Sequence, residues 1–422
     1  MPYAPDSYPR QIPQFKVHGR GEVTVSAKGI VTGDSNIPND GADFGPDTML
    51  GATAPGQYGP PYTQTFGWNE SVKYSQYAGI IKFKEGFSST GQITYPVSPN
   101  GLYGSYITYG PGLSSFVDAS GSALDGLDFI TLPSNSNPGS EYAFLDFGIQ
   151  DITTSGVNSM INQAGGTLWL SRFYFYGHSK YHIYIASGES HIDGGLFNNW
   201  TSAAIYLDTP SGGPFWFTNL QFGIGMTSAL PCIYIASGLA GGYIAQGCGF
   251  TGSTIGIQVE GQTTDLLVTM CEFAGSTGLI LNAIINTSAI IGNSFNATTQ
   301  ITFGSSFYPN NLRIQNNPGL NPFGLLATPF TTTVPSGGSP WMGPGTPSGT
   351  AAPLASTSYR VEVCDQIVTS TGGTSVSITI KDAAGNTLLS GASTLTNYYL
   401  AAGWSIDFGA FTAAPTVQVI GL

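Results

Sequence analysis

Carboxylates are the residues of this chain best suited to chemistry, and two of them recur at matching places. Asp208 lies in the segment AIYLDT (204–209), and Glu260 lies in the similar segment GIQVEG (256–261). Hydrolysis of a glycan uses two carboxyl groups roughly 5–9.5 Å apart. If the two segments are equivalent strands two layers apart, their carboxylates are separated by about 9–10 Å. The pair is therefore a candidate for an inverting hydrolase, and the alternative is two solvated acids near turns.

Other catalytic arrangements are missing from the sequence. A polysaccharide lyase needs an Arg or Lys base beside its acids, but no Lys or Arg occurs between Lys180 and Arg313. The four cysteines form no CxxC pair of the kind that binds zinc, and no acidic segment has EF-hand spacing. We therefore expect neither a metal nor a cofactor.

Aromatic residues form the second chemical feature, because they recur in two rows. Tyr184, Tyr206 and Tyr234 occupy the same place in HIYIAS, AIYLDT and CIYIAS, and a second row holds Trp169, Trp216 and Tyr243. If both rows point outward, their rings are platforms on which sugars stack. The alternatives are that the rings are buried against a neighbouring subunit or stabilise adjacent strands by stacking.

A degenerate repeat must position these residues. Apolar residues that we expect to point inward recur at intervals of 22 to 27 residues, each followed five or six residues later by a second mark that is usually Phe. Each period contains short alternating segments bounded by Gly, Asn, Ser or Thr, which is typical of strands. A period near 24 residues predicts an all-β fold, a right-handed parallel β-helix with rungs stacked at ~4.8 Å. The inward positions are Phe147, Leu170, Ile192, Phe217, Ile244, Val268, Ile290 and Ile314.

One inward column is polar. Cys248, Cys271, Asn293 and Asn317 each stand two residues before the second mark of their rung. Cysteines on adjacent rungs have Cα atoms ~5 Å apart, within reach of a disulfide. We nevertheless expect two buried free thiols, because in-register parallel strands would strain the bridge. The asparagines predict a short internal ladder of amide hydrogen bonds.

Composition excludes several classes of protein. The chain has 422 residues, only 9% of them charged, with 12 Lys and Arg against 24 Asp and Glu. A net charge of −12 argues against nucleic-acid binding, and the low charge argues against coiled coils. No run of 18 apolar residues predicts a membrane span. Residues 1–15 have no apolar h-region, so we expect no secretory signal, as in a protein released by cell lysis.

The pattern resembles known β-helix families at three places. The segments 79–86 (GIIKFKEG) and 92–97 (QITYPV) resemble the opening of the pectin-lyase-like superfamily. The segment 314–322 (IQNNPGLNP) resembles the last coil of viral tailspike and tail-fibre β-helices. The segments 376–382 (VSITIKD) and 407–411 (DFGAF) resemble small β domains appended to such viral proteins.

The resemblance and the repeat together imply four regions. These are an attachment arm rich in Pro and Gly (1–76), the β-helix (77–325), a linker (326–352) and a small C-terminal β-sandwich-like domain (353–422).

By resemblance, the chain is a virion tail fibre or tailspike that attaches to a host-surface polysaccharide or glycoprotein. It would be a homotrimer that binds other virion proteins through its N-terminal arm. Two alternatives remain open: a depolymerase that cleaves the glycan, and a purely structural component of a virion or cell surface.

Overall fold

The structure of the protein is a computed structural model. It describes residues 22–25, 68, 78–83, 86–96, 105–113, 115–134, 140–225, 230–236, 242–252, 255–304, 308–315, 317, 341–342, 349–351, 357–360, 366–401 and 404–421. The chain divides into two compact units, Met1–Ile233 and Tyr234–Leu422. Each unit is described by itself.

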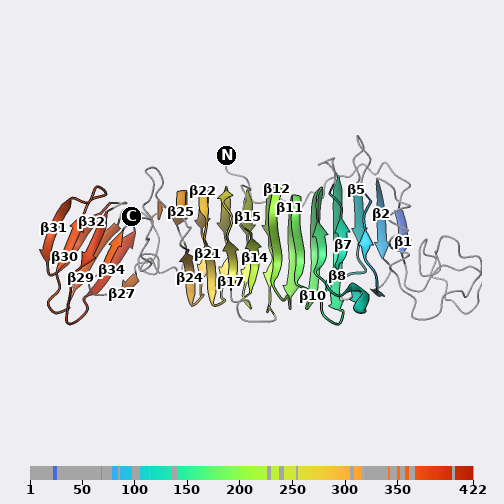
Figure 1. Cartoon of the computed structure of the whole chain (residues 1–422), viewed down its shortest axis with the longest axis horizontal. Helices are drawn as coiled ribbons and strands as arrows, with labels where there is room; N and C mark the ends of the chain where they lie inside the picture. Colours follow the sequence, from blue (N-terminus) through green and yellow to red (C-terminus); the bar gives the residue numbers. More distant parts are fainter. Residues whose placement is uncertain are drawn as a thin grey trace, which may run out of the picture. The chain divides into compact units, whose positions relative to one another are not determined.

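The first unit is a parallel β-solenoid whose rungs contribute strands to three ladders (Figure 1). The first ladder runs through β2 (Ala78–Phe83), β5 (Ser105–Tyr109), β8 (Glu141–Ile152), β10 (Thr167–Gly177), β11 (Tyr181–Asn198) and β12 (Ala203–Thr218). The second joins β3 (Phe87–Ser89) and β6 (Phe116–Ser120) to the C-terminal halves of β8, β10 and β11, and ends at β13 (Gln221–Phe222). The third joins β4 (Ile93–Thr94), β7 (Asp128–Leu132) and β9 (Ser159–Gln163) to the N-terminal halves of β11 and β12.

Sharp corners separate the first ladder from the second, and each is made by one residue with a left-handed backbone. Asp146, Arg172 and Asn219 all have φ 53°, and Gly194 has φ 61°. Gly, Asn and Asp adopt this conformation at the lowest cost. The corner lets one strand turn without losing its parallel partner, so β8, β10 and β11 each contribute to both the first and the second ladder.

The interior of the first unit is apolar and aromatic. Phe175, Phe197 and Phe222 lie in one column, and the rings of Phe197 and Phe222 stack with centroids 5.0 Å apart. Tyr106 and Tyr142, register partners in the first ladder, also stack, with ring centroids 5.8 Å apart and an interplanar angle of 2°. All five side chains are buried. Identical residues at one register position therefore build the core along the solenoid axis.

The second unit repeats this construction in its N-terminal part. One parallel ladder joins β15 (Tyr243–Gln246), β19 (Leu266–Thr269), β22 (Ile284–Ile291) and β25 (Tyr308–Gln315). A second joins β16 (Gly249–Phe250), β20 (Glu272–Phe273) and β23 (Ser294–Phe295), and a third joins β17 (Ile255–Val259), β21 (Thr277–Leu281) and β24 (Thr299–Phe303). The short strand β18 (Thr263–Thr264) pairs with the start of β22.

The polar column predicted inside this unit is confirmed. Cys248 and Cys271 are buried free thiols. The side-chain oxygen of Asn293 accepts a hydrogen bond from the backbone N–H of Cys271 at 2.9 Å. Asn293 in turn bonds Asn317, and both amides are fully buried.

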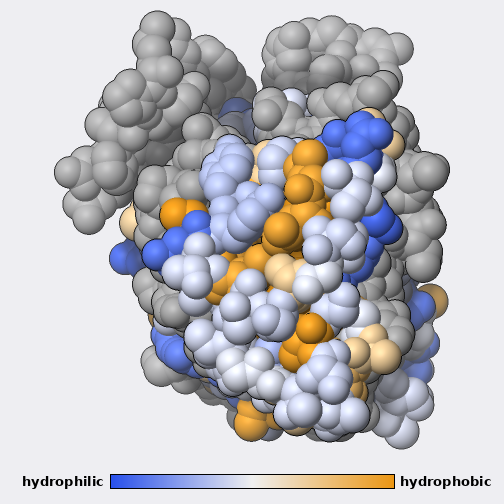
Figure 2. Space-filling model, turned by 90° about the vertical axis from the view of Figure 1, so that its left-hand side faces the viewer, coloured by the Kyte–Doolittle hydropathy of each residue, from blue (hydrophilic) through white to orange (hydrophobic). Residues whose placement is uncertain are grey.

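The rest of the second unit is a small antiparallel sandwich. One sheet has the order β27 (Gly349–Ala351), β34 (Thr416–Gly421), β29 (Gln366–Thr371), β32 (Leu395–Leu400), and the other has the order β28 (Thr357–Arg360), β33 (Ser405–Phe408), β30 (Ile378–Lys381), β31 (Thr387–Ala392). Its core includes Ile378, Ile380, Leu400 and Phe408. On the face viewed in Figure 2, apolar side chains form small separate patches among weakly polar ones.

The predicted fold class is confirmed, a parallel β-helix with a small C-terminal β domain. The predicted register is wrong at two rungs. The residue beside Leu170 is Phe144, not Phe147, which lies beside Phe173. In β15 the residue beside Val268 is Ala245, so Ile244 does not point inward.

The predicted region boundaries stay predictions, because most residues of 1–76 and 326–352 lie outside those described. Within these regions β1 (Glu22–Val25) pairs parallel with β2, and β26 (Trp341–Met342) pairs parallel with β25. The predicted last coil at 314–322 is described only at 314, 315 and 317. Within the described residues, no helix has the length and apolar character needed to cross a membrane.

Candidate functional site

Three aromatic rings form a continuous stack on the outer face of the first ladder. Trp169 in β10, His191 in β11 and Trp216 in β12 are register partners on successive rungs. The ring centroids of Trp169 and His191 lie 3.7 Å apart with an interplanar angle of 6°. Those of His191 and Trp216 lie 4.0 Å apart with an angle of 31°. We call these three residues the aromatic stack. The sequence predicted the two tryptophans here, and the histidine between them completes the column.

The aromatic stack differs from the predicted row of platforms. Both faces of the His191 ring are covered by the two indoles, and the side chain of His191 is only 7% exposed. Trp169 also packs against an outer apolar cluster of Ile107, Ala143 and Leu145. The stack therefore presents ring edges outward, and the face of the imidazole is not available to a sugar.

Two glutamates flank the aromatic stack on the same outer face. Glu141 in β8 and Glu189 in β11 are both register partners of Thr167, one on each side, so their Cα atoms are about 10 Å apart. We call them the acidic pair. Glu189 lies two residues before His191, so both side chains leave the strand on the same face. The Nε2 atom of His191 lies 2.7 Å from Oε1 of Glu189.

Burial sets the charge state of this site. It lowers the pKa of His191 to about 3, so the imidazole is neutral at pH 7 and donates its Nε2–H to the carboxylate. Burial also raises the pKa of Glu189. Burial raises the pKa of Glu141 as well, and the negative charge of Glu189 raises it further. Within the described part of the chain, no Lys or Arg pairs with either glutamate.

The corner on the other side of the stack is polar. The carboxylate of Asp193 accepts hydrogen bonds from Oγ1 of Thr218 at 2.7 Å and from Nδ2 of Asn219 at 2.9 Å. Arg172 forms an ion pair with Asp146 at 2.6 Å, so its charge is largely balanced. The aromatic stack is therefore bordered by the uncompensated carboxylates of the acidic pair on one side. On the other side it is bordered by the hydrogen-bonded carboxylate of Asp193 and the Arg172–Asp146 ion pair.

The predicted tyrosine row is present on the third ladder of the first unit. Tyr184 and Tyr206 are register partners whose half-buried rings lie 5.6 Å apart at 5°. Tyr181 adds a third ring, 4.6 Å from Tyr206. Asp208, one of the two predicted catalytic acids, accepts a hydrogen bond from the Tyr184 hydroxyl.

Two members of the predicted site lie in the second unit, and one of them corrects the prediction. Tyr243 is 1% exposed, so the expectation that it points outward is wrong, and burial raises its pKa to about 12. The error has the same cause as that at Ile244, a register shift of one residue, which exchanges the two faces of a strand. Tyr234, in β14 (Pro231–Ile235), is half-buried.

The second predicted acid, Glu260, is held by amides. Its Oε1 accepts hydrogen bonds from Nε2 of Gln258 and Nδ2 of Asn282, both at 2.7 Å. Asp208 belongs to the first unit and Glu260 to the second. Their pairing in catalysis remains a prediction.

Sequence reasoning did not place Glu141 and Glu189 in the site rather than on the solvated surface, and it did not predict the contact of Glu189 with His191. A signal for Glu189 was available, because it stands two residues before the outward His191. Glu141 could not be placed, since the register of β8 was misassigned by three residues. Among the described residues, no group of three or more His, Cys, Asp and Glu is placed to hold a metal ion.

Comparison with known proteins gives distant structural likenesses only. No family model matches the chain, and no curated protein matches it. A solved structure similar to it is the tailspike protein of Acinetobacter baumannii phage AM24, at 9% identity and a TM-score of 0.32, covering 85% of this chain and 80% of that one. Another is tailspike protein gp49 of Acinetobacter baumannii bacteriophage Fri1, described as a capsular polysaccharide depolymerase, at 11% identity and a TM-score of 0.30, covering 81% and 79%. Both of these solved structures are phage tailspike proteins.

Proposed function

We propose that the protein is a tailspike-like attachment protein of a virion that binds host-surface glycans on the outer face of its first unit. The observation that carries this proposal is the aromatic stack beside the acidic pair. Carboxylates accept strong hydrogen bonds from sugar hydroxyls, and aromatic side chains contact the apolar parts of a sugar. Rungs repeat at ~4.8 Å, so a glycan lying along the ladder would meet similar chemistry at successive rungs.

The charges around the stack favour particular glycans. Glu141 and Glu189 have no cationic partner among the described residues, and Arg172 is neutralised by Asp146. The whole chain carries a net charge of −12. A uronic-acid polymer would be repelled, whereas an amino sugar would neutralise the acidic pair. We therefore expect affinity to decrease from amino glycans to neutral glycans to acidic ones.

A panel of oligomers of glucosamine, glucose and galacturonic acid, together with a broader glycan array, tests the proposal. His191→Ala and Trp216→Ala should each weaken binding at least tenfold. Tyr399→Ala is the matched control, because Tyr399 is 46% exposed and belongs to the C-terminal sandwich of the second unit. Absence of binding to every glycan, or binding unchanged in both stack variants, would refute the assignment of this surface.

Hydrolysis is a second candidate function, and the acidic pair is the observation that favours it. Two carboxyl groups separated by 6.5–9.5 Å suit an inverting mechanism, in which one with a raised pKa protonates the leaving group and the other activates water. Burial and the charge of Glu189 both raise the pKa of Glu141, so Glu141 would be the acid, with Glu189 as the base. Release of reducing ends from a bound glycan, abolished by Glu141→Gln and by Glu189→Gln, would support it. If Asp208→Asn and Glu260→Gln abolished this release instead, the catalytic residues would be the pair predicted from sequence.

Assembly is the remaining part of the proposal. We propose a homotrimer whose 1–76 region contacts other virion proteins. Its support is the half-buried tyrosine row of Tyr184 and Tyr206, which copies can bury against one another while the aromatic stack stays outward, in a chain with only 9% charged residues. If copies bury the aromatic stack instead, the protein is a structural component and the glycan panel gives no binding.

A further inference from the structure

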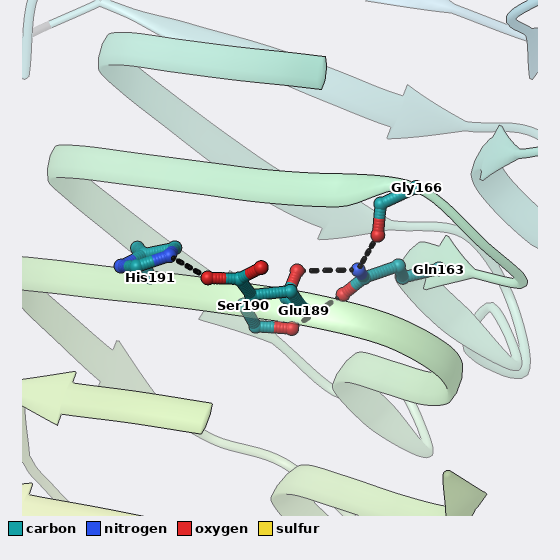
Figure 3. A network of polar contacts seen from close by, with 5 residues as sticks. All are labelled: Gln163, Gly166, Glu189, Ser190 and His191. Carbon is teal, nitrogen blue, oxygen red and sulfur yellow. Dashed lines mark hydrogen bonds and ion pairs between the residues drawn. The ribbon is translucent and has the colours of Figure 1, made fainter. Parts of the chain in front are cut away.

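A buried amide holds the backbone from which Glu189 and His191 project. Gln163 is the last residue of β9, is fully buried, and lies on the rung preceding that of Glu189. Its Nε2 donates to the backbone carbonyl of Glu189 at 2.8 Å and to that of Gly166 at 3.0 Å. Its Oε1 accepts a hydrogen bond from the hydroxyl of Ser190 at 2.6 Å. All the polar atoms of this side chain are therefore used (Figure 3).

The same contacts fix Glu189 at both of its backbone polar groups. The N–H of Glu189 donates to the carbonyl of Gly166 at 3.1 Å, while the carbonyl of Glu189 accepts a hydrogen bond from Nε2 of Gln163. Gly188, just before it, has φ 103°, and a Cβ there would lie 2.1 Å from the Gly166 oxygen and 2.8 Å from Nε2 of Gln163. The bend before Glu189 is thus closed tightly onto Gln163 and Gly166.

Side chains alternate between the two faces of a strand, so contacts on the inner face also orient the residues on the outer face. Ser190 points inward, where it meets Gln163, so its neighbours Glu189 and His191 both point outward. Figure 3 shows the Glu189 carboxylate directed to the His191 ring, and the Gln163 side chain directed to Ser190 and to the backbone carbonyls of Glu189 and Gly166. Fixing the inward residue and both backbone groups of Glu189 leaves the outward pair little freedom to turn away.

We propose that Gln163 is a positioning residue for the glycan-binding surface: it aligns Glu189 with His191 and does not itself touch the ligand. This inference rests on the proposed function for its biological meaning. Its geometric content, the dependence of the Glu189–His191 hydrogen bond on Gln163, can be measured without any ligand.

The experiment uses the full chain with ¹⁵N-labelled histidine, of which the sequence contains only four. The His191 resonance is assigned with His191→Gln, and Glu189→Gln gives its position when the carboxylate is lost. In Gln163→Leu we expect the Nε2 resonance to move at least halfway towards its position in Glu189→Gln. Affinity for a glucosamine hexamer should fall by the same factor as in Glu189→Gln.

Asn293→Leu is the matched control, because it also removes a fully buried amide that bridges rungs, but in the second unit. It should lower the melting temperature as Gln163→Leu does and leave the His191 resonance unchanged. Ser190→Ala removes only the 2.6 Å bond and provides a milder variant if Gln163→Leu does not fold. An unmoved His191 resonance in the folded variants would overturn the inference. A wild type that binds no glycan would overturn the proposed function instead, and the resonance would still decide the role of Gln163.

Discussion

The side-chain oxygen of Asn317 accepts two hydrogen bonds from Asn293, from its backbone N–H at 2.9 Å and from its Nδ2 at 3.0 Å. Asn293 also donates to the carbonyl of Val268 at 2.9 Å and accepts from the N–H of Cys271. One buried amide therefore satisfies groups on three successive rungs. This column therefore ties the corners of successive rungs together, in addition to the strand ladders and the stacked side chains.

Removing the ladder should destabilise the second unit. Asn293→Ala removes the side-chain partner of the buried Cys271 N–H and Val268 carbonyl and one of the two hydrogen bonds to the Asn317 oxygen, which should cost about 3 kcal/mol of unfolding free energy. Urea denaturation monitored by circular dichroism measures this. Asn296→Ala, three residues away and exposed, should change stability by less than about 0.5 kcal/mol. Equal effects of the two substitutions would contradict the role of the ladder.

A charged substitution should destabilise the protein strongly at one residue of β19 and hardly at all at the next. Val268 is fully buried and Thr269 is its outward neighbour. Val268→Asp places an unpaired carboxylate in the core and should destabilise the unit by about 4 kcal/mol or more. Thr269→Asp should be tolerated to within about 1 kcal/mol. Thermal unfolding and limited proteolysis compare them, and a Val268→Asp variant that melts like the wild type would mean that the inward face has been misidentified.

Acid should weaken the fold through His182. Burial lowers the pKa of this fully buried imidazole to about 3, below the 6.5 of an unfolded chain. Between pH 6.5 and 3 the unfolded state therefore binds the additional proton, so stability falls as pH falls. By pH 4 the loss from this group is about 3 kcal/mol.

Replacing His182 by an aromatic residue should remove that pH dependence. His182 lies among Phe175, Phe197 and Trp200, so His182→Phe keeps aromatic packing there. Denaturant unfolding at pH 7 and pH 4 should show a smaller acid loss in the variant than in the wild type. Phe197→Leu, which weakens the same core without removing a titrating group, should lower both curves equally. A parallel shift in His182→Phe as well would contradict the assignment.

Glu141 should make the protein more stable as pH falls, the opposite of the pH dependence expected from His182. Burial and the charge of Glu189 raise the pKa of Glu141 in the folded state above its ordinary value of 4.5. The cost is therefore present at neutral pH and disappears as pH falls through the raised pKa towards 4.5. Glu141→Gln should stabilise the protein at pH 7 by up to about 1 kcal/mol, since the side chain is partly solvated, and by nothing near pH 4. The exposed Glu272 offers a control, Glu272→Gln, which should show no such pH-dependent gain.

The pure protein should sediment as a trimer of 44.1 kDa chains. The reason is the half-buried tyrosine row of the first unit combined with very little charge to keep copies apart. Sedimentation velocity at micromolar concentration measures the mass. A monomer at that concentration would refute assembly, and a dimer would refute three-fold closure. Lys substitutions at Tyr184 and Tyr206 should favour monomers if the tyrosine row lies in the interface.

The sequence by itself determined the solenoid and much of its register. The period near 24 residues, and the Phe column that includes Phe250, Phe273 and Phe295, predicted the stacked core, in which Phe273 and Phe295 lie 4.9 Å apart. The polar column of Cys271, Asn293 and Asn317 was predicted for the same reason. Each rung packs only on its neighbours, so a repeated spacing is enough to specify which side chains meet.

Only the tertiary structure decided which side chains form the site. Tyr243, predicted on the outer face, lies in the core, because a one-residue difference in rung length exchanges the two faces of a strand. Glu141 and Glu189 share a column although 48 positions separate them, because the intervening corners and turns have particular lengths. Gln163 reaches Ser190, 27 residues further on, through a bend that closes only at Gly188. Turn length and corner conformation depend on contacts between rungs, and a pattern read along the chain does not contain them.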